Sequence, residues 1–441
     1  MIRYESQRVA RRYLELSLVL FCLQVLLGLW LAMNYAFTLP QGLVDIFSFA
    51  TARAIHTNTL VAWMLLGFMG GAYFILPLEC KRELFSVKIA YLQLMIFAGT
   101  AVAAVVGFLF GWTQGKPLLE IPVPLDILIV AAALLFVFNV AMTILQAKER
   151  TVIQWMLLAG VTFLSVLYLF GIPFFKDLNT DYYYWWWVIH LWVEGSWELI
   201  TAAIVAFIII EVTGVERRVV EKWLYVETGL FLFTGLVGTG HHYYWIGAPD
   251  YWLWWGGIFS AMEPLPIALM VVDTWMHIRG RKNPIVNPLL WTYIMGLALF
   301  HFFGAGIFGF IHTLPAINYY THGSQVTVSH GHLAFFGAYA LLNLVVFYFC
   351  MPQLKGIEKF DDRLGVWGFW IMVTAMVFMG LIFGVAGVLQ TYLERILDIG
   401  YSTVHMTMMF WFKVVLFFGV IFLYGVLLTV YHLFTLKKAA E

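Results

Sequence analysis

Twelve long apolar runs dominate this chain of 441 residues and limit what it can fold into. A helix needs about 20 consecutive apolar residues to cross the hydrocarbon core of a bilayer, and each run reaches that length. The runs are continuously apolar, which predicts helices rather than the alternating strands of a membrane barrel. The predicted spans lie near residues 13–35, 54–78, 87–112, 125–146, 153–172, 184–212, 222–244, 252–277, 289–313, 326–351, 367–392 and 408–434. We therefore expect an all-α, polytopic membrane protein with one integral-membrane domain over residues 1–441.

The composition supports this class and excludes others. Hydrophobic residues make up 62% of the chain and charged residues 11%, whereas a soluble protein averages about 45–50% and 25%. The formal net charge is zero, so the chain offers no basic surface for nucleic acid. Its three cysteines, Cys22, Cys80 and Cys350, form no CxxC or CxxCH motif, so neither a disulfide framework nor a covalent c-type haem is expected.

The distribution of Lys and Arg predicts the orientation, because cytoplasmic loops carry an excess of both. Twenty of the 25 basic residues fall before the first span, after the last one or in the even-numbered connections. They are Arg3, Arg8, Arg11, Arg12, Lys81, Arg82, Lys88, Lys148, Arg150, Arg217, Arg218, Lys222, Arg279, Arg281, Lys282, Lys355, Lys359, Arg363, Lys437 and Lys438. The other side has Arg53, Lys116, Lys176 and Arg395. Both termini are therefore predicted to be cytoplasmic, and the first span is predicted to be retained rather than cleaved.

Histidines inside the predicted spans are the first candidates for function, because ionisable residues are costly in a membrane. Six of them fall near the outer ends of four spans: His56, His190, His241, His242, His330 and His332. Five others are interpreted as packed or hydrogen-bonded residues without a ligand role: His277, His301, His312, His405 and His432. Six histidines at one depth predict a site that binds metal or haem.

Sequence spacing divides these residues between sites. His190 and Glu194 are four residues apart and share one helix face, and Glu198 lies one turn deeper on that face. On a regular helix the neighbouring His241 and His242 are about 100° apart, so both can touch one metal only at the edge of their helix. The pair at positions 330 and 332 is about 200° apart, so its members should serve different centres.

A single zinc-type site uses three or four ligands and leaves the other histidines unexplained. Haem iron takes one axial histidine where it binds a substrate and two where it only transfers electrons. The arrangement that uses all six histidines has His332 and His56 on one haem and His330 on a second.

The remaining ligands then form a non-haem metal site on the open side of the second haem. They are His190, His241, His242 and Glu194. The carboxylate oxygen favours iron over copper, although the spacing alone does not decide between the two metals.

Several motifs resemble one known family. They are RAIHTN at 53–58, HLWVEGSWE at 190–198, GTGHHYYWIGAP at 238–249, EPLP at 263–266, YYTHGSQ at 319–325 and SHGHLA at 329–334. Together they resemble the catalytic large subunit of cytochrome c-dependent nitric oxide reductase, in the haem-copper oxidase superfamily. The resemblance runs over essentially the whole chain, with the ligand order intact.

This resemblance implies a role for each residue. His56 and His332 would bind low-spin haem b, and His330 would be the proximal ligand of high-spin haem b3. A non-haem iron would be held by His190, His241, His242 and Glu194. The two glutamates Glu198 and Glu263 would help to deliver protons to that iron, or alternatively would orient its ligands. A calcium ion bridging the haem propionates is a further family feature, for which the candidates are Glu120 and the backbone of Gly67 and Met69.

Departures from relatives narrow the expected activity. An oxygen-reducing member would carry a tyrosine near the first metal histidine, where this chain has Glu194. Quinol-dependent relatives carry a long hydrophilic N-terminal extension, whereas about a dozen residues precede the first span here. The resemblance therefore implies a partner, a membrane-anchored c-type cytochrome subunit in the bacterial plasma membrane.

The expected reaction joins two NO molecules to give N2O and water. Electrons would pass through the low-spin haem b, and protons would come from the periplasm, because no ladder of polar residues leads from the ligands to the cytoplasm. Turnover would then move no charge across the membrane. The alternatives are a haem-copper oxygen reductase, an enzyme that dismutates NO, and a twelve-span transporter.

Overall fold

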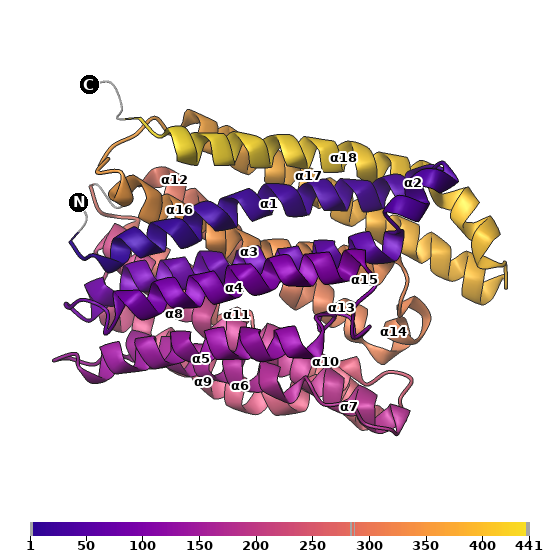
Figure 1. Ribbon diagram of the computed structural model, residues 1–441, viewed down its shortest axis with the longest axis horizontal. Helices are drawn as coiled ribbons and strands as arrows, with labels where there is room; N and C mark the ends of the chain where they lie inside the picture. The colour runs from indigo at the N-terminus through magenta and orange to yellow at the C-terminus, as the bar shows by residue number, and fades with distance from the viewer. Residues whose placement is uncertain (1–2, 283–284, 286, 438–441) are drawn as a thin grey trace.

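The computed structural model describes residues 3–282, 285 and 287–437, and Lys438 lies outside them. Within these residues the chain is a bundle of long helices that run roughly alongside one another (Figure 1). The helices are α1 (Ser6–Ala36), α2 (Gln41–Ile46), α3 (Phe49–Glu79), α4 (Val87–Leu109), α5 (Val123–Leu145), α6 (Val152–Phe170), α7 (Leu178–Ile189), η1 (His190–Gly195), α8 (Ser196–Thr213), α9 (Arg217–Gly238), η2 (Thr239–His242), α10 (Asp250–Ser260), α11 (Leu265–Ile278), α12 (Pro288–Phe300), η3 (His301–Ile307), α13 (Phe308–Thr313), α14 (Pro315–Thr321), α15 (Gln325–Phe335), η4 (Phe336–Ala340), α16 (Leu341–Leu354), α17 (Arg363–Thr391), η5 (Tyr392–Ile396) and α18 (Tyr401–Thr435).

Eleven helical units in the described ranges are long and apolar enough to cross a membrane. The expectation of an all-α, multi-pass membrane protein is therefore confirmed. The twelfth crossing is α9, which the same criterion does not select because charged residues interrupt its apolar face. These are Arg217, Arg218, Glu221, Lys222 and Glu227. It packs against α8, α10 and α11 along the length of the bundle.

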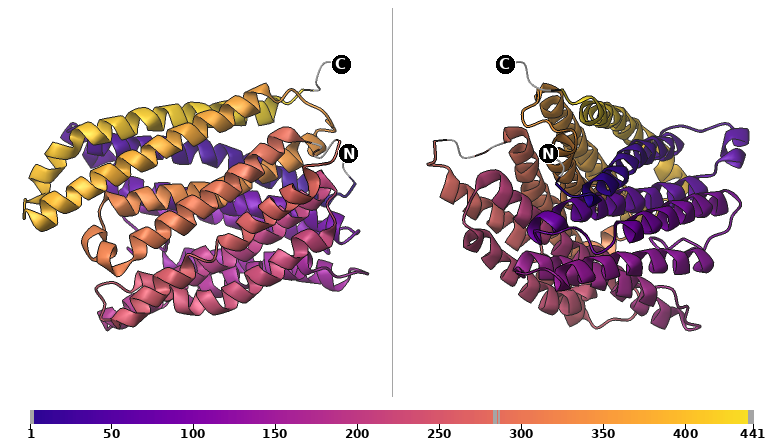
Figure 2. Two further views of the ribbon diagram at one scale, coloured as in Figure 1. Left: turned by 180° about the vertical axis from the view of Figure 1, so that it is seen from behind. Right: turned by 60° about the vertical axis from the view of Figure 1, so that its left-hand side comes forward.

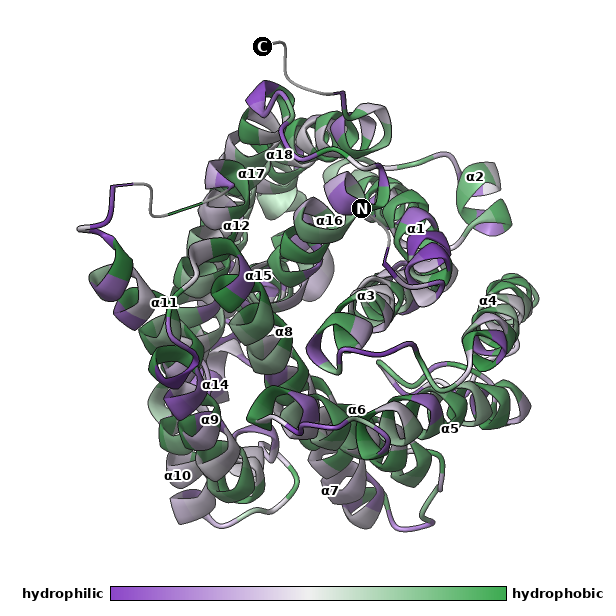
Figure 3. Cartoon of the chain, turned by 90° about the vertical axis from the view of Figure 1, so that its left-hand side faces the viewer, coloured by the Kyte–Doolittle hydropathy of each residue, from purple (hydrophilic) through white to green (hydrophobic). Residues whose placement is uncertain are grey.

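The two ends of the bundle differ in character. The end at which α1 begins and α18 finishes carries the turns rich in Lys and Arg, and we call it the basic end (left in Figure 1). The short helices α2 and α14 lie at the opposite end, and the view from behind shows the same arrangement (Figure 2). Seen from the basic end, the hydrophobic colour follows the helices and the hydrophilic colour gathers in the connecting turns (Figure 3).

The long helices are less regular than the sequence predicts. The predicted span 252–277 is two helices, α10 and α11, with residues 261–264 between them. Pro264 and Pro266 explain the break, because proline has no N–H to continue the helix and also restricts the residue before it. Three other spans contain a π-helical segment: η1 before α8, η3 after α12 and η4 before α16. Such segments are frequent at functional sites.

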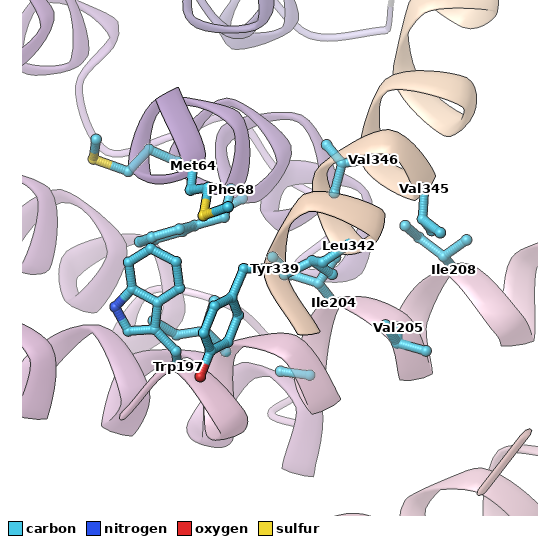
Figure 4. Packing of buried hydrophobic residues seen from close by; sticks show 14 of the residues in the cluster. Met64, Phe68, Trp197, Ile204, Val205, Ile208, Tyr339, Leu342, Val345 and Val346 are labelled. Atoms are coloured by element: carbon cyan, nitrogen blue, oxygen red, sulfur yellow. The ribbon is translucent and has the colours of Figure 1, made fainter. Parts of the chain in front are cut away.

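The buried core is centred on α8, α16 and the neighbouring part of α3. Ile204, Val205, Leu342 and Val345 have exposed fractions of 2% or less and lie between these helices, as Figure 4 shows. This part of α8 and α16 is regular α-helix without a buried charge. This apolar part of α8 and α16 supports the π-helical segments η1 and η4, which adjoin these helices toward the opposite end of the bundle.

Candidate metal centre

Four side chains that could share one cation meet near the opposite end of the bundle. Their ligand atoms lie within 4.8 Å of one another, and they come from His190, Glu194, His241 and His242. The Glu194 carboxylate is at the centre: its Oε2 is 3.2 Å from Nδ1 of His190, and its Oε1 is 3.0 Å from Nε2 of His242. The Nε2 atom of His241 lies 3.5 Å from Oε2. The structure therefore brings together the four residues for which the sequence predicts a metal site.

Two irregular segments place these ligands. His190 and Glu194 lie in the π-helical η1, which turns less per residue than an α-helix, and they nevertheless stay on one face. His241 and His242 end the 3₁₀ segment η2, and both rings lie within 3.5 Å of the Glu194 carboxylate. The ring of Trp186 lies parallel to His242 at 5.0 Å, which fixes the orientation of that imidazole.

The chemistry of the donors fits a metal ion. The Nε2 atoms of His241 and His242 face each other at 2.7 Å, and both ring nitrogens of the fully buried His190 lack a hydrogen-bond partner within the described residues. A buried polar atom without a partner is costly, and a cation satisfies several of them at once. Three imidazoles and a carboxylate are a ligand set suited to iron among the transition metals.

A second carboxyl, Glu263, lies next to this group but not in it. It occupies the turn between α10 and α11, where its Oε1 accepts a hydrogen bond of 2.7 Å from the Thr234 hydroxyl. The same oxygen is 3.8 Å from Nε2 of His190. Ser260 lies between the two carboxyls, 3.3 Å from Glu194 and 3.4 Å from Glu263. Glu263 can therefore exchange protons with the site through Ser260 or orient His190.

Glu198 has a different neighbour from the one the sequence suggests. Instead of extending the metal face, it accepts a 2.6 Å hydrogen bond from Nε2 of His301, the first residue of η3. Both side chains are buried. The hydrogen bond agrees with the interpretation of His301 as a packed or hydrogen-bonded residue, and its partner is 103 positions away in the chain. No local spacing could reveal this pair.

A cavity of about 420 Å³ is lined by both His56 and His332. Nδ1 of His56 donates to the Gln24 carbonyl at 2.9 Å, and Nδ1 of His332 donates to the Val328 carbonyl at 2.9 Å. With Nδ1 as the donor, both Nε2 atoms keep a lone pair, the form that ligates iron, and that of His56 accepts a hydrogen bond of 3.3 Å from the Gln24 side-chain amide. The residues present therefore fit a haem with two axial histidines.

His330 lies on the same helix as His332, α15, but its ring has different neighbours. Its ring lies 5.8 Å from His312 and 6.0 Å from Phe308, and the charges that act on it include Glu194 and His241. Its Nδ1 atom is buried without a hydrogen-bond partner among the described residues. The structure thus places His330 toward the metal group and His332 toward the cavity.

The three calcium candidates do not meet. Glu120 accepts a 2.8 Å hydrogen bond from Asn58 and lies 3.5 Å from Arg53. Gly67 and Met69 are nine or more residues further along α3, which is about 13 Å at 1.5 Å per residue. The participation of Gly67 and Met69 in a calcium site with Glu120 therefore remains a prediction, and Glu120 alone is too few ligands for calcium. Burial raises the pKa of Glu120, against the opposing effect of Arg53.

Known proteins match this chain over most of its length. Residues 8–422 match the family described as Cytochrome C and Quinol oxidase polypeptide I. A nitric oxide reductase subunit of Stutzerimonas stutzeri is 41% identical over 98% of this chain and 95% of that protein. The Cbb3-type cytochrome c oxidase subunit CcoN1 of the same organism is 23% identical over 89% of this chain and 85% of its own length. A cytochrome c oxidase subunit 1 homolog of Agrobacterium tumefaciens (strain T37) is 21% identical over 85% and 72%.

Proposed function

The chain belongs to the Cytochrome C and Quinol oxidase polypeptide I family of the haem-copper oxidase superfamily, and from that membership we propose that it is a membrane oxidoreductase that reduces nitric oxide. The proposed reaction takes two NO, two electrons and two protons to N2O and water. The observation that carries it is Glu194 among three histidines, at the position where an oxygen reductase would carry its tyrosine. The relative that shares 41% of its residues with this chain has the name of a nitric oxide reductase subunit.

The same residues support the proposed cofactors. His190, His241, His242 and Glu194 would hold a non-haem iron, and His330 would hold a high-spin haem b3 on the facing side. A low-spin haem b would lie between His56 and His332. When bound, the paired irons would hold two NO molecules close together and supply the electrons for N–N coupling.

The protein residues around this centre can hold and move protons. Glu263 is bound by Thr234, and Ser260 links it to Glu194. Glu198 is hydrogen-bonded to His301 at 2.6 Å. We place these groups near the periplasmic face because the basic end of the bundle fits the cytoplasmic side. Both protons would then enter from the periplasm, and turnover would move no charge across the membrane.

Electron delivery requires a partner. The chain has no CxxCH motif to carry a c-type haem. We propose that this chain pairs with a membrane-anchored c-type cytochrome subunit, which reduces the haem held by His56 and His332. This role of the partner follows from the family and from the missing motif.

An oxygen reductase is the second candidate, because two of the relatives are named as oxidases or their homologue. Glu194 argues against it, since a carboxylate among the metal ligands lowers the effective positive charge of the metal and favours iron over copper. The metal present in the purified protein separates the two functions.

The test uses the chain purified from membranes together with any other chain that accompanies it. Haem and metal are quantified, and consumption of NO and of O2 is measured with a reduced c-type cytochrome as electron donor. The proposal expects two b-type haems and one non-haem iron per chain, with N2O formed from NO. Copper in place of non-haem iron, or rapid O2 reduction without N2O formation, would contradict it.

A further inference from the structure

One buried carboxyl lies outside every motif discussed above. Glu227 is in the middle of α9, with an exposed fraction of 1%. The residues that share its buried face are Val220, Leu224, Phe231, Thr234 and Gly238. These follow the three- and four-residue spacing of one helix stripe, in which an apolar side chain is expected at position 227.

Glu227 has no partner for its charge within the described residues. Its Oε2 atom is buried without a hydrogen bond, and it takes part in no ion pair there. A carboxylate without a partner in a membrane interior costs several kcal/mol, and such a group is instead held in its neutral, protonated form. The side chain therefore stores a proton in a region with little else that could accept one.

Its neighbours connect it to the proposed centre. Its helix, α9, packs against α8, which carries Glu198, and against α10 and α11, whose connecting turn carries Glu263. Thr234, the hydroxyl that binds Glu263, lies seven residues further along α9, which is two turns or about 10 Å on the same face.

Other charged groups around α9 are committed elsewhere. Asp273 of α11 binds Lys222 at 2.5 Å nearer the basic end, and α6, which also packs on α9, carries no charged residue. The residues toward the basic end on the same stripe are the buried Leu224 and Val220. Glu227 is therefore the last polar group on this face before an apolar stretch.

We propose that Glu227 is a proton store for the reduction of NO, filled and emptied from the side of the metal group. This inference rests on the proposed function. One proton of the two consumed would leave the Glu227 carboxyl, pass by way of Glu263 or Glu198, and end in the water that is released. The Glu227 carboxylate would then take up a proton from the periplasmic side, again by way of Glu263 or Glu198, before the next turnover.

The first test compares variants of the purified enzyme with its haems and iron in place. Glu227→Gln keeps the shape of the side chain and removes the proton, and we expect NO turnover to fall about tenfold at neutral pH and more steeply as pH rises. Glu227→Asp keeps a titratable group and should retain more turnover than Glu227→Gln. Glu211→Gln makes the same chemical change at an exposed position of α8 and should leave turnover unchanged.

Two results overturn the proposal. One is a Glu227→Gln enzyme with the turnover and pH profile of the parent. The other is an equal loss in Glu227→Gln and Glu227→Asp without a change in pH profile, which would mean that Glu227 only supports the structure.

A second readout does not depend on NO turnover. Infrared difference spectra between the oxidised and reduced protein should contain the carbonyl band of a protonated carboxyl that disappears in Glu227→Gln and shifts in Glu227→Asp. If the parent consumes no NO but shows this band, the proposed function fails while the proton-holding role of Glu227 stands. If the band is the same in parent and variants, the proton store is excluded.

Discussion

The two halves of α8 differ in the side chains that they bury: one half buries polar groups and the other buries apolar groups. Toward the opposite end, the π-helical η1 leads into Glu198, which pairs with His301. Toward the basic end, Ile204 and Ile208 lie in regular helix and are buried against α16 (Figure 4). One half contains buried polar atoms without protein partners, and the other contains closely packed apolar side chains. The difference shows that this helix stabilises the bundle with one half and carries chemistry with the other.

The backbone follows the same division. Three of the π-helical segments and the 3₁₀ segment η2 lie beside or within the group of ligands and their neighbours. All four proposed metal ligands, His190, Glu194, His241 and His242, lie in two of these irregular segments, η1 and η2. The apolar half of α8 can remain regular helix, because apolar packing depends on the volume and shape of side chains more than on the direction of single polar atoms.

The largest effect should come from a ligand in the polar half. His242→Ala removes one nitrogen from the metal group, so we expect the non-haem metal to be lost and NO turnover to fall at least about hundredfold. Metal analysis and NO consumption measure this. His277→Ala is the matched control, because His277 is half-exposed at the basic end. Retention of metal and activity in His242→Ala would separate this residue from the centre.

The next largest effect on turnover should come from a residue that lines the cavity between His56 and His332. His332→Ala removes one of the two nitrogen donors that face this cavity, and we expect the optical signature of the low-spin haem to disappear. Non-haem metal should remain, while turnover falls about tenfold or more because electrons no longer reach the centre. A variant that keeps both haem signatures would show that His332 is not an axial ligand.

A smaller effect should follow from the pair that joins α8 to η3. His301→Ala leaves Glu198 buried without its partner, which costs about 1–3 kcal/mol of stability. We expect a lower thermal midpoint and a several-fold loss of turnover with unchanged metal content. Adding Glu198→Gln should restore the midpoint but not the turnover. If His301→Ala has parental turnover, the pair has no part in proton transfer.

The smallest effect on activity should come from the apolar half. Val345→Ala removes two methyl groups from a fully buried position, which costs about 1 kcal/mol of stability. We expect a lower thermal midpoint with normal metal, haem and turnover. Val420→Ala on the exposed face of α18 is the matched control and should change neither quantity. A large loss of activity in Val345→Ala would mean that the two halves are coupled more closely than their packing indicates.

Much of the candidate site could be predicted from local sequence. The six histidines and Glu194 stand out because polar residues are rare in apolar runs, and their spacing gives the face on which each lies. Glu198–His301 and Glu227 could not be found this way. The first pair joins helices far apart in the chain, and the second is a single acidic residue whose neighbours come from other helices.

The sequence by itself determined that the chain crosses a membrane many times and which residue types are available for chemistry. Apolar length and charge distribution act through the solvent, so they can be read without knowing which helices touch. Tertiary structure alone decided which carboxyl meets which histidine, since these contacts depend on the pitch of short irregular segments and on the packing of distant helices. The same packing buried Glu227 on α9, between helices that carry the other carboxyls of this region.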